Sequence, residues 1–200
     1  GVNGMDMSFM DKSSAVTPHL VRLYDQHKNY SAAGERSPMA RVEFTNSIAE
    51  ILDFETSPRE AEMIADVLID LVRQAETDLR QAIAEKLAGI PNAPLRLILQ
   101  FTNDEINIAS SVLMKSEVLD DLDLIYIVKS QGPEYWQCIA SRKKMSDQVI
   151  NILADTNDLE TAIALAENMN ITLTNHAIVA LSDLAQDSDR LALPLLRREE

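Results

Sequence analysis

Apolar positions between residues 58 and 72 recur at the three- and four-residue spacing of an amphipathic helix. Ser57 and Pro58 precede this stripe, and Glu60 completes the Ser-x-x-Glu signature of a helix start. A hydroxyl residue followed by proline recurs at Thr17-Pro18 and Ser37-Pro38. Because proline suits the first position of a helix, the sequence predicts helices that begin near residues 18, 38 and 58. The stripe contains Ala61, Ile64, Ala65, Leu68, Leu71 and Val72.

From residue 76 onward one pattern occurs four times: an acidic residue, then an apolar residue, then a small residue four positions after the acid. The acids are Asp78, Glu105, Glu134 and Asp158, and the small residues are Ala82, Ala109, Cys138 and Ala162. A second apolar segment follows each time, at 95–101, 122–128, 149–153 and 177–184. The pattern predicts helix-turn-helix repeats of 24 to 29 residues, with a partial unit from Asp189.

One such unit cannot bury its apolar face alone, so adjacent units are expected to stack and share an elongated core. The acid suits the positive end of a helix, and the small residue lets neighbouring helices approach closely. We therefore divide the chain into three parts. Residues 1–36 are expected to be a polar arm with a short helix, whose Gly1–Gly4 looks like an expression-vector remnant; 37–75 form capping helices; and 76–200 form the repeats.

Composition supports an all-α fold, because 5 glycines and 4% aromatic residues in 200 are few for a sheet protein. The net charge of -14 has the wrong sign for nucleic acid or an anionic membrane, so we expect neither as a partner. Residues 145–189 hold eight acids and no lysine or arginine, which favours a basic protein or peptide. A single cysteine and the lack of a long apolar run predict a cytoplasmic protein.

Three segments carry a likeness to known proteins: 78–88 (DLRQAIAEKLA), 112–125 (VLMKSEVLDDLDLI) and 138–149 (CIASRKKMSDQV). They resemble HEAT-like helical repeat proteins, and in particular a bacterial, mostly alphaproteobacterial, family known only as a domain of unknown function. The resemblance covers roughly residues 40–197. It implies a HEAT-like α-solenoid, a right-handed superhelix of helix-turn-helix repeats with an N-terminal helical cap. It carries over no activity, cofactor or catalytic residue.

The candidate partner-binding residues are Tyr135, Trp136, Arg142, Lys143 and Lys144. The three bases form the only such run in the chain and suit a phosphate or an acidic peptide, although they also suit the end of a helix. Trp136 is the only tryptophan and is either an interaction hot spot or part of the core between repeats.

Other polar groups have simpler interpretations. The acids Glu117, Asp120, Asp121 and Asp123 are expected to form a helix cap and a solvated turn, with Asp120 or Asp121 capping the helix that begins near Leu122; they lack the spacing of a calcium loop, and partner contact is the alternative. Cys138 occupies a small-residue position and is expected to be a buried, inert thiol. We expect no metal, no cofactor and no catalytic residue.

The sequence thus favours a non-catalytic scaffold for protein-protein interaction. One alternative is an anion- or nucleotide-responsive signalling domain that uses Arg142, Lys143 and Lys144. A second is a HEAT-like enzyme acting on nucleic acid, which the charge disfavours. Self-association through the N-terminal helices is compatible with each of these functions.

Overall fold

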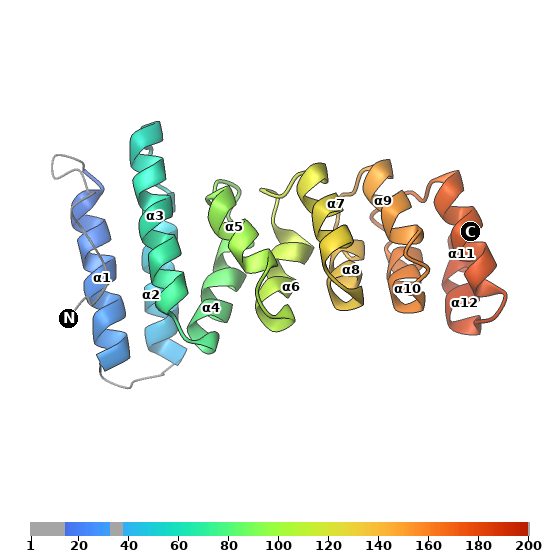
Figure 1. The fold of residues 1–200 in the computed structure, drawn as a ribbon, viewed down its shortest axis with the longest axis horizontal. Coiled ribbons are helices and arrows are strands. Elements are labelled where there is room, and N and C mark those ends of the chain that lie inside the picture. Colours follow the sequence, from blue (N-terminus) through green and yellow to red (C-terminus); the bar gives the residue numbers. More distant parts are fainter. Residues whose placement is uncertain (1–14, 33–37, 200) are drawn as a thin grey trace.

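A computed structural model describes residues 15–32 and 38–199, and within these ranges all regular structure is helical, as predicted (Figure 1). The first three helices are α1 (Thr17–Ala32), α2 (Pro38–Leu52) and α3 (Pro58–Gln74). The next four are α4 (Thr77–Leu87), α5 (Leu95–Thr102), α6 (Ile106–Lys115) and α7 (Asp121–Ser130). The last five are α8 (Pro133–Ala140), α9 (Asp147–Ala154), α10 (Leu159–Glu167), α11 (Asn175–Ala185) and α12 (Asp189–Arg197).

The predicted start of α3 is confirmed in atomic detail. The Ser57 side chain accepts a hydrogen bond from the Glu60 amide at 3.2 Å, and the Ser57 amide donates to the Glu60 carboxylate at 3.1 Å. Pro58 occupies the first turn, where its missing N–H leaves no partner unsatisfied. Eight apolar residues of α3 are buried, so this helix forms a central part of the N-terminal core.

Helix α1 is longer than the short helix expected inside a polar arm. It runs for 16 residues because Leu20, Leu23 and Tyr24 lie on one face and are buried in the common core. The helix packs against both α2 and α3, so residues 17–32 are part of the folded body. The remainder of the expected arm, including Gly1–Gly4, lies outside the described residues.

Helices α4 to α11 fall at the eight positions predicted from the acid, apolar and small-residue pattern, and α12 falls at the partial unit. Ala109 and Ala162 are buried, as the close approach of helices requires, whereas Ala82 and Cys138 are half-buried. The shared core extends from Val16 to Leu191 without a break between the N-terminal helices and the later pairs.

The helices lie side by side along the long axis, with α1 and α12 at opposite ends (Figure 1). Helices α2, α4, α6, α8, α10 and α12 form one row, in which each packs against the next. Helices α7, α9 and α11 pack in sequence on the other side. Each first helix of a pair therefore meets the first helix of the following pair. None of the helices in 15–32 and 38–199 has the length and apolar character needed to cross a membrane.

Candidate functional site

A long polar side chain joins α8 to the C-terminal end of α6. Arg142 follows α8, and its Nη1 and Nη2 donate hydrogen bonds of 2.6 Å to the carbonyl oxygens of Leu113 and Ser116. The last carbonyls of a helix have no partner within the helix, so the guanidinium satisfies groups that would otherwise be buried without a donor. Arg142 is buried for this reason, in contrast to its neighbours Lys143 and Lys144, which are exposed.

The next two junctions in the same row, α8 with α10 and α10 with α12, have a similar bond. In each, a side chain that follows one helix donates to carbonyl oxygens at the end of the preceding helix. Asn168 follows α10, and its Nδ2 donates to the carbonyl oxygens of Ala140 and Arg142 at 2.9 and 2.8 Å. Arg198 follows α12 and reaches back to the end of α10. Its Nη1 donates to the Ala166 and Asn168 carbonyl oxygens at 3.1 and 2.7 Å, and its Nη2 donates to the Ile171 carbonyl oxygen at 2.6 Å.

The junction between α4 and α6 differs, because the side chain of Ser116 after α6 makes no bond to α4. Its hydroxyl accepts a hydrogen bond from the Val118 amide at 3.3 Å and stays within its own turn. Among the residues that the structure describes, no side-chain hydrogen bond joins the C-terminal turn of α4 to that of α6. A pocket of about 460 Å³ occupies this place.

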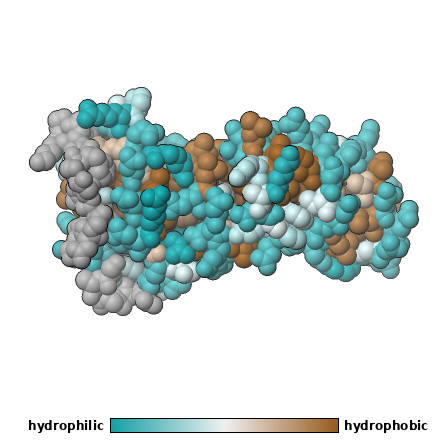
Figure 2. All heavy atoms as spheres, viewed as in Figure 1, coloured by the Kyte–Doolittle hydropathy of each residue, from teal (hydrophilic) through white to brown (hydrophobic). Residues whose placement is uncertain are grey.

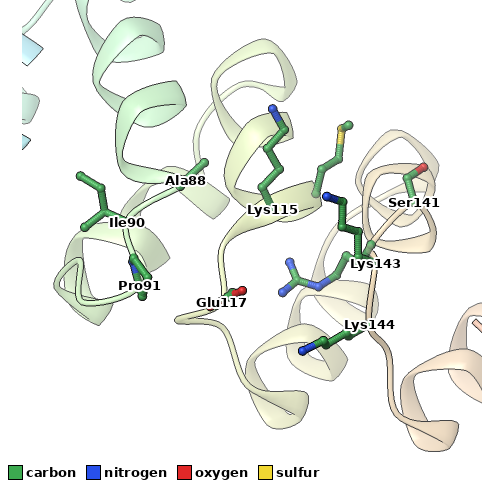
Figure 3. Close-up of a pocket in the computed structure, with 11 residues that line it drawn as sticks. Ala88, Ile90, Pro91, Lys115, Glu117, Ser141, Lys143 and Lys144 are labelled. Atoms are coloured by element: carbon green, nitrogen blue, oxygen red, sulfur yellow. The ribbon is translucent and has the colours of Figure 1, made fainter. Parts of the chain in front are cut away.

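The pocket is lined by the chain ends of three successive first helices (Figure 3). One wall is formed by the turn after α4, from Ala88 to Pro91, and contains Ile90 and Pro91. The end of α6 contributes Met114, Lys115 and Glu117, and the turn after α8 contributes Ser141, Arg142, Lys143 and Lys144. Figure 3 shows the three lysines around the opening, with the Ile90 and Pro91 side chains across from them.

The lining of this pocket is strongly cationic. It contains four basic side chains and one carboxylate, in a chain whose net charge is -14. Within residues 15–32 and 38–199, Lys115, Lys143 and Lys144 form neither an ion pair nor a side-chain hydrogen bond. Burial lowers the pKa of Arg142, and the nearby Glu117 carboxylate opposes that shift. The Nε of Arg142 is buried and has no hydrogen-bond partner among the described residues.

The structure separates the candidate residues into two groups. Tyr135 donates its hydroxyl proton to the Asp104 carbonyl oxygen at 2.6 Å, and Trp136 Nε1 donates to the Val128 carbonyl oxygen at 2.8 Å. Both rings are half-buried against the core, and their polar atoms join α8 to the turn before α6 and to α7. Burial, with the Asp104 carboxylate a smaller cause, raises the pKa of Tyr135.

Lys143 and Lys144, in contrast, line the pocket together with Lys115, which the sequence pattern did not single out. The one available signal for Lys115 was its place as the last residue of α6, where a cation also stabilises the helix end. No sequence pattern indicates that the turn after α4 lies opposite these lysines.

Asp120 caps α7, as predicted, and Asp123 completes a capping box. The Asp123 amide donates to the Asp120 carboxylate at 2.9 Å, and the Asp120 amide donates to the Asp123 carboxylate at 3.0 Å. Burial is the main cause that raises the pKa of Asp123. In the part of the chain that the structure describes, no three His, Cys, Asp or Glu side chains are placed to hold a metal ion.

Cys138 is half-buried on α8. Burial raises the pKa of its thiol, and the carboxylate of Glu134 adds to this shift. A raised pKa lowers the thiolate fraction near neutral pH, which makes the thiol a weaker nucleophile than a free cysteine.

Comparison with curated proteins and with solved structures gave no match. One family model matches the chain, and the match extends from the first turn of α6 through α12. It includes every pocket residue except those of the turn after α4. The expected likeness to a bacterial family of unknown function is confirmed over this part: residues 108–200 match the family described as "Uncharacterised protein conserved in bacteria (DUF2336)".

Proposed function

We propose that the chain is a non-catalytic scaffold, built as a HEAT-like α-solenoid, that binds another protein. The observation that carries this proposal is the recurrence of one structural device at three consecutive junctions, formed by Arg142, Asn168 and Arg198. Equivalent bonds at equivalent places support a stack of equivalent units, each in contact with its neighbours. Such a stack presents an extended, firmly held surface to a partner.

The surface of α9 to α11 favours a basic partner. Residues 145–189 contain eight acids and no lysine or arginine. Two of these acids form an ion pair within the described chain: Glu160 pairs with Arg190 at 2.8 Å, and Asp155 pairs with His176 at 2.6 Å. Five other acids are exposed and form no ion pair among the described residues. They are Asp147, Glu167, Asp183, Asp187 and Asp189.

Exposed apolar side chains lie in the same region. Met169 is 70% exposed, Val179 is 63% exposed, and Ile178 lies beside Val179 on α11. Figure 2 shows brown apolar atoms among teal hydrophilic ones at the α11–α12 end of the molecule. Apolar groups surrounded by acids suit a segment that combines lysine or arginine with a few apolar residues. We therefore propose that a basic, partly apolar segment of a protein binds this surface.

Capture from an extract of the native cells tests the proposal. The chain is immobilised, and bound protein is compared for the wild type, Val179→Asp on α11 and Met39→Asp on α2. Both substituted side chains are well exposed, so neither change disturbs the core. We expect the same protein on the wild type and on Met39→Asp, and its loss from Val179→Asp. We also expect elution between 50 and 500 mM salt, because salt screens charges.

Two results would contradict the proposal. Retention of the captured protein by Val179→Asp at the wild-type level would exclude the α11 surface. Retention that is unchanged at high salt would exclude the electrostatic attraction between acids of α9 to α11 and a basic partner.

A further inference from the structure

We propose that the pocket between the C-terminal ends of α4, α6 and α8 binds a phosphorylated small molecule. This inference goes beyond the proposed scaffold function, because the pocket lies apart from the α11 surface assigned to the protein partner. It rests on the shape of one junction, on the charge of its lining, and on lysine side chains that have no ion-pair partner among the described residues.

The cavity lies where, among the described residues, no side chain that follows α6 bonds to the end of α4. At the following junctions Arg142, Asn168 and Arg198 extend across to the carbonyl oxygens of the preceding first helix. At the α4–α6 junction the residue after the helix is Ser116, which does not reach α4. The volume of about 460 Å³ lies within the range of small-molecule sites, which is about 300–1,000 Å³.

The lining concentrates positive charge that no ion pair within the described residues neutralises. Lys115, Lys143 and Lys144 form no ion pair among the described residues, and Glu117 is the only carboxylate in the lining. Like charges repel, so grouping these cations is unfavourable unless an anion joins them. Lysine ammonium groups are common ligands of phosphate, and three of them match a group with several negative charges.

Arg142 makes the site more rigid. Its two Nη atoms are fixed on the Leu113 and Ser116 carbonyl oxygens, so the positive charge of the guanidinium is held in the pocket wall. Its buried Nε lacks an acceptor among the described residues, which leaves an unsatisfied donor at this wall. A fixed cation costs less conformational entropy on binding than a mobile one.

The opposite wall is suited to the organic part of such a ligand. Ile90 and Pro91 in the turn after α4 provide apolar surface across from the lysines (Figure 3), and Met114 at the end of α6 adds to the apolar lining. A recessed site with cations on one side and apolar groups on the other favours a compact molecule such as a nucleoside phosphate. An acidic peptide is a different class of ligand, and it serves as a comparison in the test.

Isothermal titration calorimetry of the full chain with pyrophosphate, ADP and tetraglutamate tests the proposal. We expect one site per chain for pyrophosphate, tighter binding of ADP because of the Ile90 and Pro91 wall, and no saturable binding of tetraglutamate. The double variant Lys143→Ala/Lys144→Ala is expected to weaken pyrophosphate binding at least about tenfold, since two charged contacts are lost. Glu117→Gln is expected to tighten pyrophosphate binding severalfold.

Lys129→Ala is the matched control, because Lys129 is exposed on α7 and does not line the pocket. It is expected to leave pyrophosphate affinity within about twofold of the wild type. The substituted lysines are all exposed, so circular dichroism melting curves should be unchanged.

The proposal is overturned if pyrophosphate does not bind, or if tetraglutamate binds more tightly. It is also overturned if Lys129→Ala weakens pyrophosphate binding as much as the Lys143→Ala/Lys144→Ala double variant does. ADP that binds more weakly than pyrophosphate would refute the role given to the apolar wall. These results are independent of the protein-capture experiment, so either proposal can fail alone.

Discussion

Replacement of Arg142 by methionine is the sharpest test of how successive helix pairs are held together. Methionine keeps most of the buried stem of arginine but removes the guanidinium. The Leu113 and Ser116 carbonyl oxygens then lose hydrogen bonds of 2.6 Å at the C-terminal end of α6. The packing of the aliphatic part changes little, so the experiment measures mainly those two bonds.

The expected loss in the free energy of unfolding follows from the number of bonds. A hydrogen bond to a charged group contributes about 1.5–3 kcal/mol, so two such bonds set an upper limit of about 6 kcal/mol. Part of this is recovered, because water from the neighbouring pocket reaches the carbonyls and no guanidinium has to be desolvated. We expect Arg142→Met to lower the free energy of unfolding by about 2–4 kcal/mol.

Urea unfolding followed by two probes measures this loss. Circular dichroism reports the helices as a whole, whereas the fluorescence of Trp136 reports α8, where its Nε1 donates to the Val128 carbonyl oxygen. Arrays of stacked helices can unfold in parts, so the two probes together show where the change acts. We expect the Trp136 midpoint to fall at least as far as the circular dichroism midpoint.

Lys143→Met is the control, because Lys143 is the next residue and is exposed. Its effect is expected to stay within about 0.5 kcal/mol, as is usual for surface positions. A loss below about 1 kcal/mol in Arg142→Met, or an equal loss in Lys143→Met, would refute the assignment of Arg142 as a joint between α6 and α8.

Three further predictions concern stability. Asn168→Ala should cost about 1–3 kcal/mol in urea unfolding, because the Ala140 and Arg142 carbonyl oxygens lose their donor, whereas Asn170→Ala on the exposed surface should be near neutral. Ser57→Ala should cost about 1 kcal/mol by the same measurement through loss of the α3 cap, and an unchanged midpoint would refute the role of the capping box. His27 is buried beside Phe44, and burial lowers its pKa from 6.5, so the unfolded chain binds more protons and stability should fall as the pH drops below about 6.5. The slope between pH 7 and 5 should be shallower in His27→Gln; an identical slope would show that other groups cause it.

Much of the secondary structure could be predicted from the sequence. Helices α2, α3 and α8 begin at a proline, and the caps of α3 and α7 lie within four residues of chain. Signals of this kind act over one or two turns, so they can be interpreted without knowledge of the fold. The extent of α1 was underestimated, because a polar segment with few apolar residues is stabilised by packing against α2 and α3.

The candidate site shows where prediction from the sequence ends. Arg142, Lys143 and Lys144 are consecutive bases, and nothing in their order distinguishes them. In the structure Arg142 is buried on the carbonyls of α6, whereas the two lysines line a pocket with Lys115. The direction of each side chain depends on which helix end lies beneath the turn, which is set by packing across 26 to 29 residues.

The sequence by itself thus determined that the chain folds into paired helices and where those helices begin, since apolar periodicity and capping are local properties. The tertiary structure alone decided that Ser116 leaves a cavity where Arg142, Asn168 and Arg198 make bonds at other junctions. Whether a short side chain leaves a pocket depends on its distance from the neighbouring helix. That distance is set only when the helix pairs pack together.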